Sequence, residues 1–398
     1  MKRQTTAPAN ARHAHSETPG TKSIRLLYVA PANSVHSFKW VEFFRAQGCD
    51  VTWYSFHPVS EAQQANYPML RPRHLSFGPL APLSLVIGWL YLFFAARRLR
   101  PQILHAHSVG RYGIAAAFLF LRPFVATAWG SDILVSGKSR WMGPFVRFAL
   151  RRADLITCDA DHMIAEMSAM GVDSSKMLRI NFGVDTDALT RLDSPDPGYA
   201  ARFRQGRDVL TVISLRNHSG VYDIATLVRA VPLIRDRVAN VRVIIAGRGP
   251  LTDSLKALAC ELGVADSVEF IGGYDGSALR RMFSACDVYV STSLSDAGIA
   301  ASTAEAMACC VPVVISDTGE NEKWIQAGVN GCLFRAKDHE GLAAKVVSLL
   351  EDGELRARIG SSGRETTVAR NSYRGEMTRM LEAYRDLLAQ VSGGAAGR

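Results

Sequence analysis

The sequence predicts an α/β protein made of two doubly wound, parallel-sheet domains of Rossmann-like type. Short apolar, β-branched runs alternate with longer helical segments through most of the 398 residues. This alternation is typical of parallel sheets covered by helices on both faces. It breaks once, at LDSPDPGY (192–199), where two prolines and a glycine indicate a connection between domains. Each half is long enough to bury a core of its own.

The predicted elements follow one another along the chain. Residues 1–23 are polar and lack an apolar run, so we expect a disordered leader and no secretory signal. Helices are expected near 38–47, after Gly110, at 141–152 and at 375–390. Strands are expected at 24–29, 51–55, 103–105, 124–127 and 155–158 in the first domain, and at 209–213, 241–246, 268–270, 288–290 and 313–315 in the second.

The segment 80–96 is unusually apolar for an amphipathic helix. Its seventeen residues carry no charge, and three arginines follow within the next four positions. It falls short of the roughly 20 apolar residues that span a bilayer, and Pro82 and Gly88 interrupt it. Two interpretations stay open: a buried crossover helix, or a helix that dips into one leaflet with an arginine collar.

The net charge of +9 is concentrated in the first domain. Residues 1–190 hold 21 Lys and Arg against 12 Asp and Glu, and the rest of the chain is neutral. A basic face suits an anionic partner such as nucleic acid, a membrane surface or an acidic substrate. The segment 138–152 places five basic residues beside Trp and Phe, which indicates either a solvated face or a membrane contact. Seven cysteines without CxxC spacing are expected to be reduced and buried, as in a cytoplasmic protein.

The stretch SDAGIAASTAEAMACCVPVVIS (295–316) has the order loop, helix, buried strand. Ligands of α/β proteins lie where loops follow strands, and a helix start offers free N–H groups and a positive dipole end to phosphate. Glu305 is the lone acid of this helix, among residues too small to pair with it. An arginine at a strand end opposite such a helix, as Arg216 is, suits a diphosphate. No P-loop and no GxGxxG after the first strand occurs, which disfavours a kinase or a dehydrogenase.

The chain resembles the family 4 glycosyltransferases, retaining sugar transferases of the GT-B fold. The matching segments, in order, are ILHAHSVGRYG, VATAWGSDIL, ADLITCDADHM, NFGVDTDAL, VIIAGRGPL, VEFIGGY, CDVYVSTS, AEAMACCVPVVISDTGENEKWI and GVNGCLF. The resemblance implies an acceptor-binding domain at 24–192, a linker at 193–207 and a nucleotide-sugar-binding domain at 208–370. A final helix at 371–392 is expected to cross back onto the first domain.

The resemblance also implies roles for individual residues. Glu305 matches a glutamate that bonds the ribose hydroxyls of the donor, and Arg216 matches the arginine that neutralises the departing diphosphate. His107 matches a histidine that reaches the donor sugar. Further substrate contacts are expected from Asp132, Trp129, Arg248, Tyr274, Asp296, Gly298, Ser302, Thr303 and His36.

Four features depart from the family pattern, and two of them are a glycine pair absent from APANSVHS in the first loop and a histidine expected where Trp129 stands. Ala297 stands eight positions before Glu305, where a first glutamate is usual, and Asp296 is the neighbouring candidate to replace it. Val221 stands five positions after Arg216, where a lysine is usual, and Arg248 is the candidate to supply the missing positive charge. These departures concern the identity of the donor more than the fold.

The function implied is transfer of a sugar from a nucleotide-diphosphate sugar to a glycan acceptor, with retention of anomeric configuration, in cell-surface polysaccharide or lipopolysaccharide synthesis. The basic, apolar first domain favours a lipid-linked acceptor and a cytoplasmic protein at the inner leaflet. No metal, other cofactor or nucleic-acid partner is expected. Two alternatives stay open: a nucleotide-sugar epimerase of the same architecture, with Asp132 as its acid, and a non-catalytic sugar-nucleotide-binding subunit, suggested by Ala297 and Val221.

Overall fold

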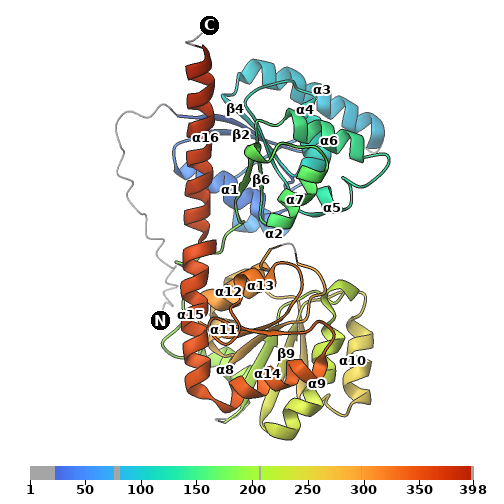
Figure 1. Ribbon diagram of the computed structural model, residues 1–398, viewed down its shortest axis with the longest axis vertical. Coiled ribbons are helices and arrows are strands. Elements are labelled where there is room, and N and C mark those ends of the chain that lie inside the picture. Colours follow the sequence, from blue (N-terminus) through green and yellow to red (C-terminus); the bar gives the residue numbers. More distant parts are fainter. Residues whose placement is uncertain (1–22, 76–80, 206–207, 297, 396–398) are drawn as a thin grey trace, which may run out of the picture.

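The computed structural model describes residues 23–75, 81–205, 208–296 and 298–395 and forms two lobes, one above the other in Figure 1. The N-terminal lobe, coloured blue to green, lies above the C-terminal lobe, coloured mostly yellow to orange. Each lobe is built on one parallel sheet with helices on both faces. The predicted architecture of two Rossmann-like domains is confirmed.

The N-terminal sheet has seven strands in the order β3-β2-β1-β4-β5-β6-β7. The strand order reverses between β1 and β4, so a ligand crevice is expected at their carboxyl ends. The strands are β1 (Arg25–Val29), β2 (Asp50–Ser55), β3 (Arg73–His74), β4 (Ile103–His107), β5 (Phe124–Thr127), β6 (Leu155–Cys158) and β7 (Met177–Arg179). The helices are α1 (Val35–Ala46), α2 (Glu61–Asn66), α3 (Ala81–Leu99), η1 (Val109–Gly113), α4 (Ile114–Ala117), α5 (Ser131–Leu134), α6 (Gly143–Arg152), α7 (Asp161–Ala169) and η2 (Ser174–Lys176). Sequence analysis missed β3 and β7, because two or three residues are too few to show a pattern.

The C-terminal sheet has six strands in the order β10-β9-β8-β11-β12-β13. They are β8 (Leu210–Ser214), β9 (Val241–Ala246), β10 (Val268–Gly272), β11 (Val288–Ser291), β12 (Val313–Ser316) and β13 (Cys332–Phe334). The helices are α8 (Pro197–Arg204), η3 (Gly220–Tyr222), α9 (Ile224–Arg237), α10 (Thr252–Glu261), η4 (Gly276–Ala278), α11 (Leu279–Ser284), α12 (Ala301–Ala308), α13 (Asn321–Trp324), α14 (His339–Glu351), α15 (Gly353–Asn371) and α16 (Tyr373–Ala395). Helix α8 occupies much of the expected linker, because Phe203 is fully buried in the core of this lobe.

The last two helices run along one side of both lobes (Figure 1, red). Helix α15 packs on α12 and α14 of the C-terminal lobe. Helix α16 packs on the N-terminal lobe, where its Tyr384 is fully buried against Phe44. The Tyr384 hydroxyl lies 2.5 Å from Nδ1 of His105, a residue of β4. The expected return of the final helix to the first domain is therefore confirmed.

Helix α3 contains the apolar segment, apart from residue 80, which lies outside the described residues. Leu92 and Ala96 are buried in the core, as a crossover helix requires. Gly88 allows close packing, because a Cβ there would lie 1.9 Å from the carbonyl oxygen of Leu75. The opposite face is apolar and exposed, with Phe94 67% exposed. No helix among the described residues is long and apolar enough to cross a membrane.

Candidate functional site

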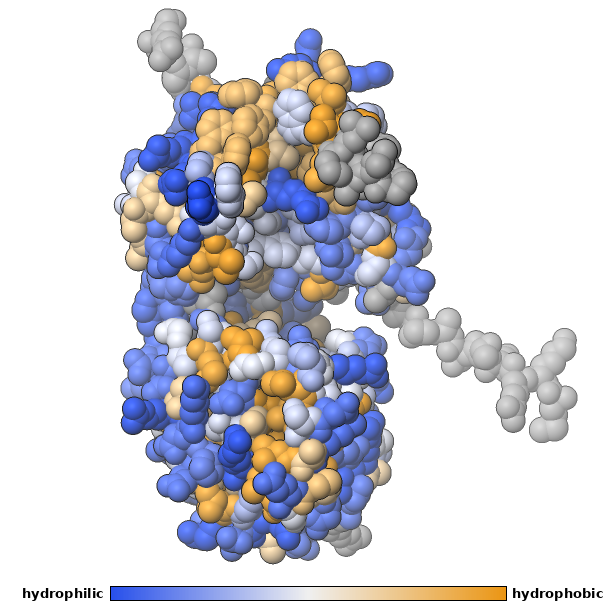
Figure 2. Space-filling model, turned by 90° about the vertical axis from the view of Figure 1, so that its right-hand side faces the viewer, coloured by the Kyte–Doolittle hydropathy of each residue, from blue (hydrophilic) through white to orange (hydrophobic). Residues whose placement is uncertain are grey.

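A cavity of about 260 Å³ lies between the lobes, at the carboxyl ends of both sheets. The surface is recessed between the lobes in Figure 2. Residues of both lobes line this cavity. The N-terminal lobe supplies His36, Asp159, Asn181 and Phe182, and the C-terminal lobe supplies Arg216, Asp296 and Gly298.

Arg216 follows β8 and provides a buried positive charge at the cavity wall. Its side chain is 10% exposed, and its Nη2 donates to Oδ1 of Asp296 at 2.5 Å. The guanidinium carbon lies 4.4 Å from the ring centre of Tyr222, which fixes its orientation. The Nε atom is buried and has no partner among the described residues. An N–H held in this way can bond an incoming anion such as a diphosphate oxygen.

Asp296 directly precedes position 297, where the resemblance places the first glutamate. Burial raises the pKa of its carboxyl group, whereas the charge of Arg216 lowers it. The carboxylate is engaged with Arg216, and position 297 lies outside the described residues. A role for Asp296 in binding the sugar stays a prediction.

The start of α12 faces the cavity with its backbone. Ala300 precedes the first turn and provides no side-chain cap, and the first N–H groups of a helix have no intrahelical partner. The Ser302 hydroxyl bonds the Tyr289 hydroxyl at 2.8 Å, and Thr303 is only 1% exposed. These two hydroxyl groups are therefore turned into the lobe, and the backbone of this turn remains for a phosphate.

Glu305 lies further along α12 without a bonding partner. Its carboxylate makes no hydrogen bond and no ion pair among the described residues. Burial raises the pKa of Glu305 to about 7, although the nearby charge of Lys39 lowers it. Burial, followed by the charge of Glu305, raises the pKa of Tyr274. Neither Glu305 nor Tyr274 is among the residues that line the cavity, and their contact with a nucleoside stays a prediction.

His107 does not line the cavity. Its side chain is fully buried, its Nδ1 is hydrogen-bonded to the Tyr28 hydroxyl at 2.6 Å, and its ring packs 4.4 Å from Trp40. Burial holds the pKa of His107 well below its usual range. The imidazole at the cavity wall is that of His36, whose pKa burial and Lys39 lower to about 4. The rings of Trp40 and Trp129 pack against His107. His107 can contact a donor sugar only if these rings move.

Asp132 acts as a structural connector between two loops. Its Oδ1 accepts from the backbone N–H of Trp129 at 2.9 Å, and its Oδ2 accepts from that of Val109 at 2.7 Å. The loop after β5 is thereby fixed to the loop after β4. The Trp129 ring lies 5.1 Å from that of His107, as part of the aromatic cover. Neither side chain is among those that line the cavity.

Arg248 lies in the loop after β9. It is exposed, and its guanidinium lies over Gly272, where an added Cβ would meet Nε at 3.2 Å. It is not among the residues that line the cavity. The hypothesis that Arg248 supplies the charge missing at Val221 therefore has no support from the position of its side chain.

Asp159 is a cavity residue that sequence analysis missed. It follows β6, and one of its carboxylate oxygens, Oδ1, is buried without a partner in the part of the chain that the structure describes. Burial raises the pKa of Asp159 to about 6. Its carbonyl oxygen lies 3.0 Å from where a Cβ on Gly298 would be, so the two lobes meet here through a glycine. The acid that directly follows the strand in ADLITCDADHM was the available signal.

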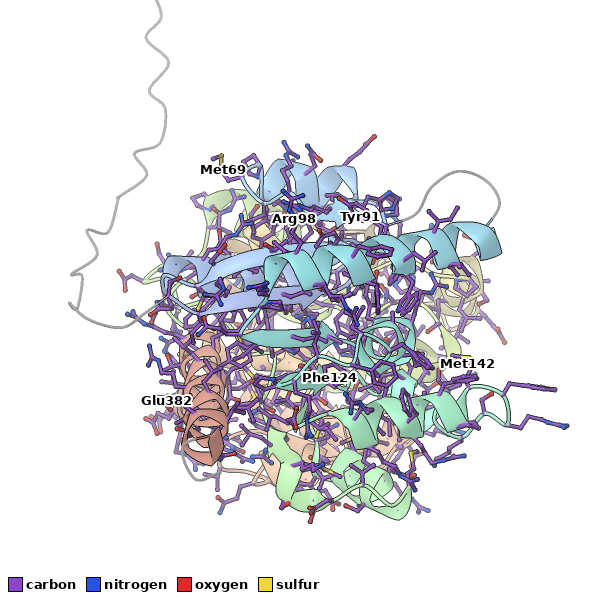
Figure 3. All side chains as sticks on the ribbon, turned by 90° about the horizontal axis from the view of Figure 1, so that it is seen from above. Met69, Tyr91, Arg98, Phe124, Met142 and Glu382 are labelled. Atoms are coloured by element: carbon purple, nitrogen blue, oxygen red, sulfur yellow. The ribbon has the colours of Figure 1, made fainter. Side chains whose placement is uncertain are left out.

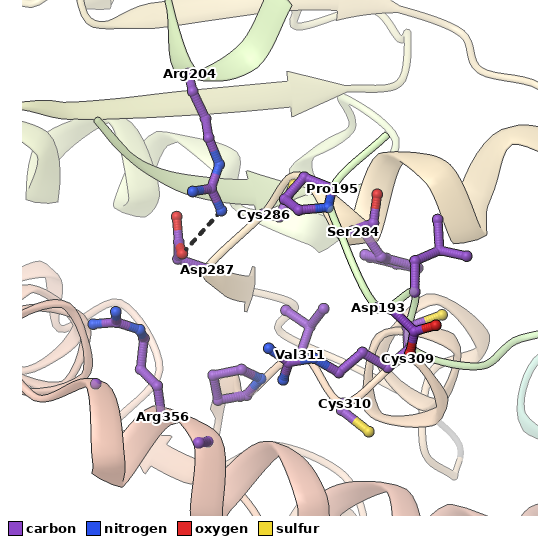
Figure 4. A pocket seen from close by; sticks show the side chains of 16 residues that line it. Asp193, Pro195, Arg204, Ser284, Cys286, Asp287, Cys309, Cys310, Val311 and Arg356 are labelled. Atoms are coloured by element: carbon purple, nitrogen blue, oxygen red, sulfur yellow. Dashed lines mark hydrogen bonds and ion pairs between the residues drawn. The ribbon is translucent and has the colours of Figure 1, made fainter. Parts of the chain in front are cut away.

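A second cavity, of about 320 Å³, lies within the C-terminal lobe (Figure 4). Asp287 and Pro312 line it and directly precede β11 and β12, so it lies at the amino edge of the sheet, away from the cleft. Arg204 is paired with Asp287 at 3.2 Å, and Arg356 donates to two carbonyl groups at the end of α14. Arg204, Asp287 and Arg356 are thus already engaged. Among the described residues, no three His, Cys, Asp or Glu side chains gather as metal ligands.

Comparisons with known proteins match both lobes. A family model described as "Glycosyl transferase 4-like" matches residues 25–160, and one described as "Glycosyl transferases group 1" matches residues 201–366. A GDP-mannose-dependent alpha-(1-6)-phosphatidylinositol monomannoside mannosyltransferase of Mycolicibacterium smegmatis is 28% identical over 68% of this chain and 74% of its own. The N-acetyl-alpha-D-glucosaminyl L-malate synthase of Bacillus anthracis is 24% identical over 75% of this chain and 78% of its own.

Solved structures show the same fold. Anabaena Alr3699/HepE in complex with UDP superposes with a TM-score of 0.76 at 18% identity, over 91% of this chain and 100% of the other. A glycosyltransferase from Rickettsia africae gives a TM-score of 0.76 at 15% identity, over 92% of this chain and 99% of the other.

Proposed function

We propose that this chain, a GT-B glycosyltransferase of the family 4 type with a nucleotide-sugar donor, transfers the sugar, with retention of anomeric configuration, to a lipid-linked glycan acceptor. The observation that carries the proposal is the arrangement around α12. Arg216 has an unused N–H beside the cavity, the first turn of α12 has free backbone N–H groups, and Glu305 has no bonding partner among the described residues. A sugar nucleotide supplies a diphosphate for the first two groups and ribose hydroxyls for the third.

In the proposed reaction, the chain binds and orients both substrates and stabilises the leaving group. The bond between the sugar and the diphosphate breaks as the acceptor oxygen bonds the anomeric carbon on the same face. The departing diphosphate oxygen takes the acceptor proton, and Arg216 and the start of α12 stabilise the negative charge that develops there. We propose that this arrangement needs no metal ion.

The acceptor class rests on two observations. The mannosyltransferase among the relatives acts, by its name, on phosphatidylinositol monomannoside, which is a lipid. The N-terminal lobe exposes an apolar face on α3, next to Arg97 and Arg98. We therefore propose a cytoplasmic protein that works at the inner leaflet in the synthesis of a cell-surface polysaccharide or lipopolysaccharide.

The first test is turnover with GDP-mannose and UDP-glucose, with and without a lipid extract as acceptor. The proposal is supported if the nucleoside diphosphate is released only when the acceptor is present and the sugar is recovered on the lipid. Isomerisation of the donor without an acceptor indicates the epimerase. Donor binding without any turnover indicates a binding subunit.

Donor affinity is expected to rise with pH through Glu305. The ionised carboxylate accepts the ribose hydroxyls, and with a pKa of about 7 it is mostly protonated at pH 6 and mostly ionised at pH 8. The donor Kd, measured by isothermal titration calorimetry, should fall about tenfold between these two pH values, in proportion to the ionised fraction.

The substitution Glu305→Gln removes the titrating group and should give a Kd that is weak and independent of pH. Glu305→Ala should raise the Kd at pH 8 by about tenfold or more, because the charged hydrogen bonds are lost. Glu354→Gln, at an exposed position of α15, is the matched control. A flat pH profile in the unmodified protein would contradict the assignment of Glu305.

Removal of divalent metal ions is expected to leave most of the activity. Arg216 and the start of α12 supply the positive charge that a metal ion provides in other enzymes. Initial rates after dialysis against EDTA should stay above half of the untreated rate. A loss that added Mg²⁺ or Mn²⁺ restores would contradict the metal-free mechanism.

A further inference from the structure

The N-terminal lobe contains an apolar groove of about 530 Å³ between α3, α4 and α6. The part of its wall formed by these helices consists of Leu85, Trp89, Ile114, Ala115, Phe118 and Met142. In Figure 3, which looks down on this lobe, α3 carries Tyr91 and Arg98, and Met142 lies at the start of α6. No residue of this groove lines the cavity between the lobes, so the groove is a separate feature.

The groove begins at the edge of the sheet that faces the cleft. Phe56, which lines it, directly follows β2, and Arg111, which also lines it, lies in η1 just after β4. The carboxyl ends of β2 and β4 belong to the same edge of the parallel sheet that holds His36 and Asp159 at the cavity. A molecule with its polar end at the cleft can therefore extend its other end into the groove.

The surface around the groove is also apolar. On α3, Val86, Leu90 and Phe94 are between 43% and 67% exposed, and beside α6 Trp141 is 73% exposed. Figure 2 shows orange and tan side chains gathered on the upper part of this lobe. Contiguous apolar surface of this kind marks an interaction site in a soluble protein.

Positive charge accompanies this apolar surface. Arg111 at the groove, and Arg97 and Arg98 at the end of α3, form no ion pair among the described residues. The excess charge of the whole chain falls in the half that forms this lobe. An apolar chain attached to an anionic group complements both features, whereas an apolar peptide or a second copy of this basic chain complements only the first.

We propose that the groove holds the hydrocarbon chain of the acceptor, a phosphate-bearing lipid, with the phosphate near Arg111 and the sugar end directed to the cleft. This inference rests on the proposed function for the identity of the acceptor. Beyond the proposed function, the inference assigns a binding site to the groove. It also explains why the apolar surface of α3 continues inward between the helices instead of ending as a flat patch. A bilayer contact alone needs the exposed face of α3 but not the groove.

The test uses single-chain alkyl phosphates from hexyl to dodecyl phosphate, below their micelle concentrations and without nucleotide. Binding is followed by the tryptophan fluorescence to which Trp89 contributes, and by calorimetry. Each added methylene should improve the Kd about fourfold, equivalent to ~0.8 kcal/mol, until the groove is full. A Kd that does not depend on chain length overturns the proposal.

Two substitutions probe the groove itself. Ala115→Trp fills it and should remove the chain-length dependence, and Met142→Glu, at a half-exposed position that tolerates charge, should do the same. Arg111→Gln should weaken binding by about tenfold at every chain length, because only the phosphate contact is lost. Val368→Trp, on the exposed face of α15 in the other lobe, is the control for bulk. Chain-length dependence that persists in folded Ala115→Trp and Met142→Glu overturns the proposal.

Two further outcomes separate the alternatives. If these variants lose binding to phosphatidylcholine–phosphatidylglycerol vesicles but keep the alkyl-phosphate series, the surface is a bilayer contact and the groove proposal fails. If the alkyl-phosphate series behaves as expected but no acceptor receives a sugar, the groove proposal stands and the proposed function fails. Transfer to the lipid extract, with no chain-length dependence in the alkyl-phosphate series, overturns the groove proposal alone.

Discussion

Replacement of Arg216 by glutamine is expected to lower kcat by about 100- to 1,000-fold. Glutamine keeps a hydrogen-bond donor at this position but removes the positive charge that stabilises the diphosphate as it departs. The side chain is 10% exposed, so bulk water cannot replace that charge. The donor Kd should rise less, by about tenfold, because the charge interaction is strongest in the transition state.

The measurement is nucleoside-diphosphate release under saturating donor and acceptor. Arg216→Lys should give an intermediate rate, because it keeps the charge but loses the planar fork that Tyr222 orients. Arg237→Gln, at an exposed position of α9 in the same lobe, is the matched control and should retain the full rate. A kcat of Arg216→Gln within threefold of the unmodified enzyme would exclude Arg216 from the chemical step.

Truncation of Tyr384 to alanine is expected to cost about 3–5 kcal/mol in the free energy of unfolding of the N-terminal lobe. The ring is fully buried between α16 and the sheet, and its hydroxyl is the partner of His105 Nδ1. Tyr384→Phe keeps the packing but leaves that nitrogen without a partner, so it should cost about 1–3 kcal/mol.

Urea unfolding followed by tryptophan fluorescence can locate this effect. Five of the six tryptophans lie in the N-terminal lobe and only Trp324 lies in the C-terminal lobe. The transition seen by fluorescence should therefore shift more than the transition of the C-terminal lobe seen by circular dichroism. Equal shifts of both transitions would mean that α16 does not stabilise the N-terminal lobe selectively.

The histidines of β4 illustrate the limit of inference from the sequence. In the sequence, His105 ends the predicted strand 103–105 and His107 follows it, which is where a substrate-binding residue is expected, whereas β4 continues to His107. Both side chains point to the same face of the sheet, and distant segments cover that face. Trp40 of α1 packs on His107, and Tyr384 of α16 bonds His105. The local sequence around the two histidines cannot indicate that their side chains are buried, because the residues that bury them come from distant parts of the chain.

Asp132 and Asp159 show the same limit of inference from the sequence. Asp132 was predicted to contact substrate but does not line the cavity, whereas Asp159 was not predicted and does line it. Both are acids that follow a strand of the N-terminal sheet. Asp132 is occupied by two backbone N–H groups of neighbouring loops, whereas Asp159 keeps an unpartnered oxygen at the cavity. Which of two similar acids stays available depends on the loop geometry, and loop geometry is set by packing between strands that are not adjacent in sequence.

The sequence by itself determined the two parallel sheets and the position of Arg216 after a strand of the second sheet, whereas the return of the last helix was implied by the resemblance to the family 4 glycosyltransferases. It could do so because strand and helix periodicity is local, and because the carboxyl ends of parallel strands always meet at one edge. Only the tertiary structure decided which side chains reach the cavity and which face of α3 stays exposed. Burial of a side chain depends on the surfaces that pack on it, and in this chain those surfaces come from segments far apart in the sequence.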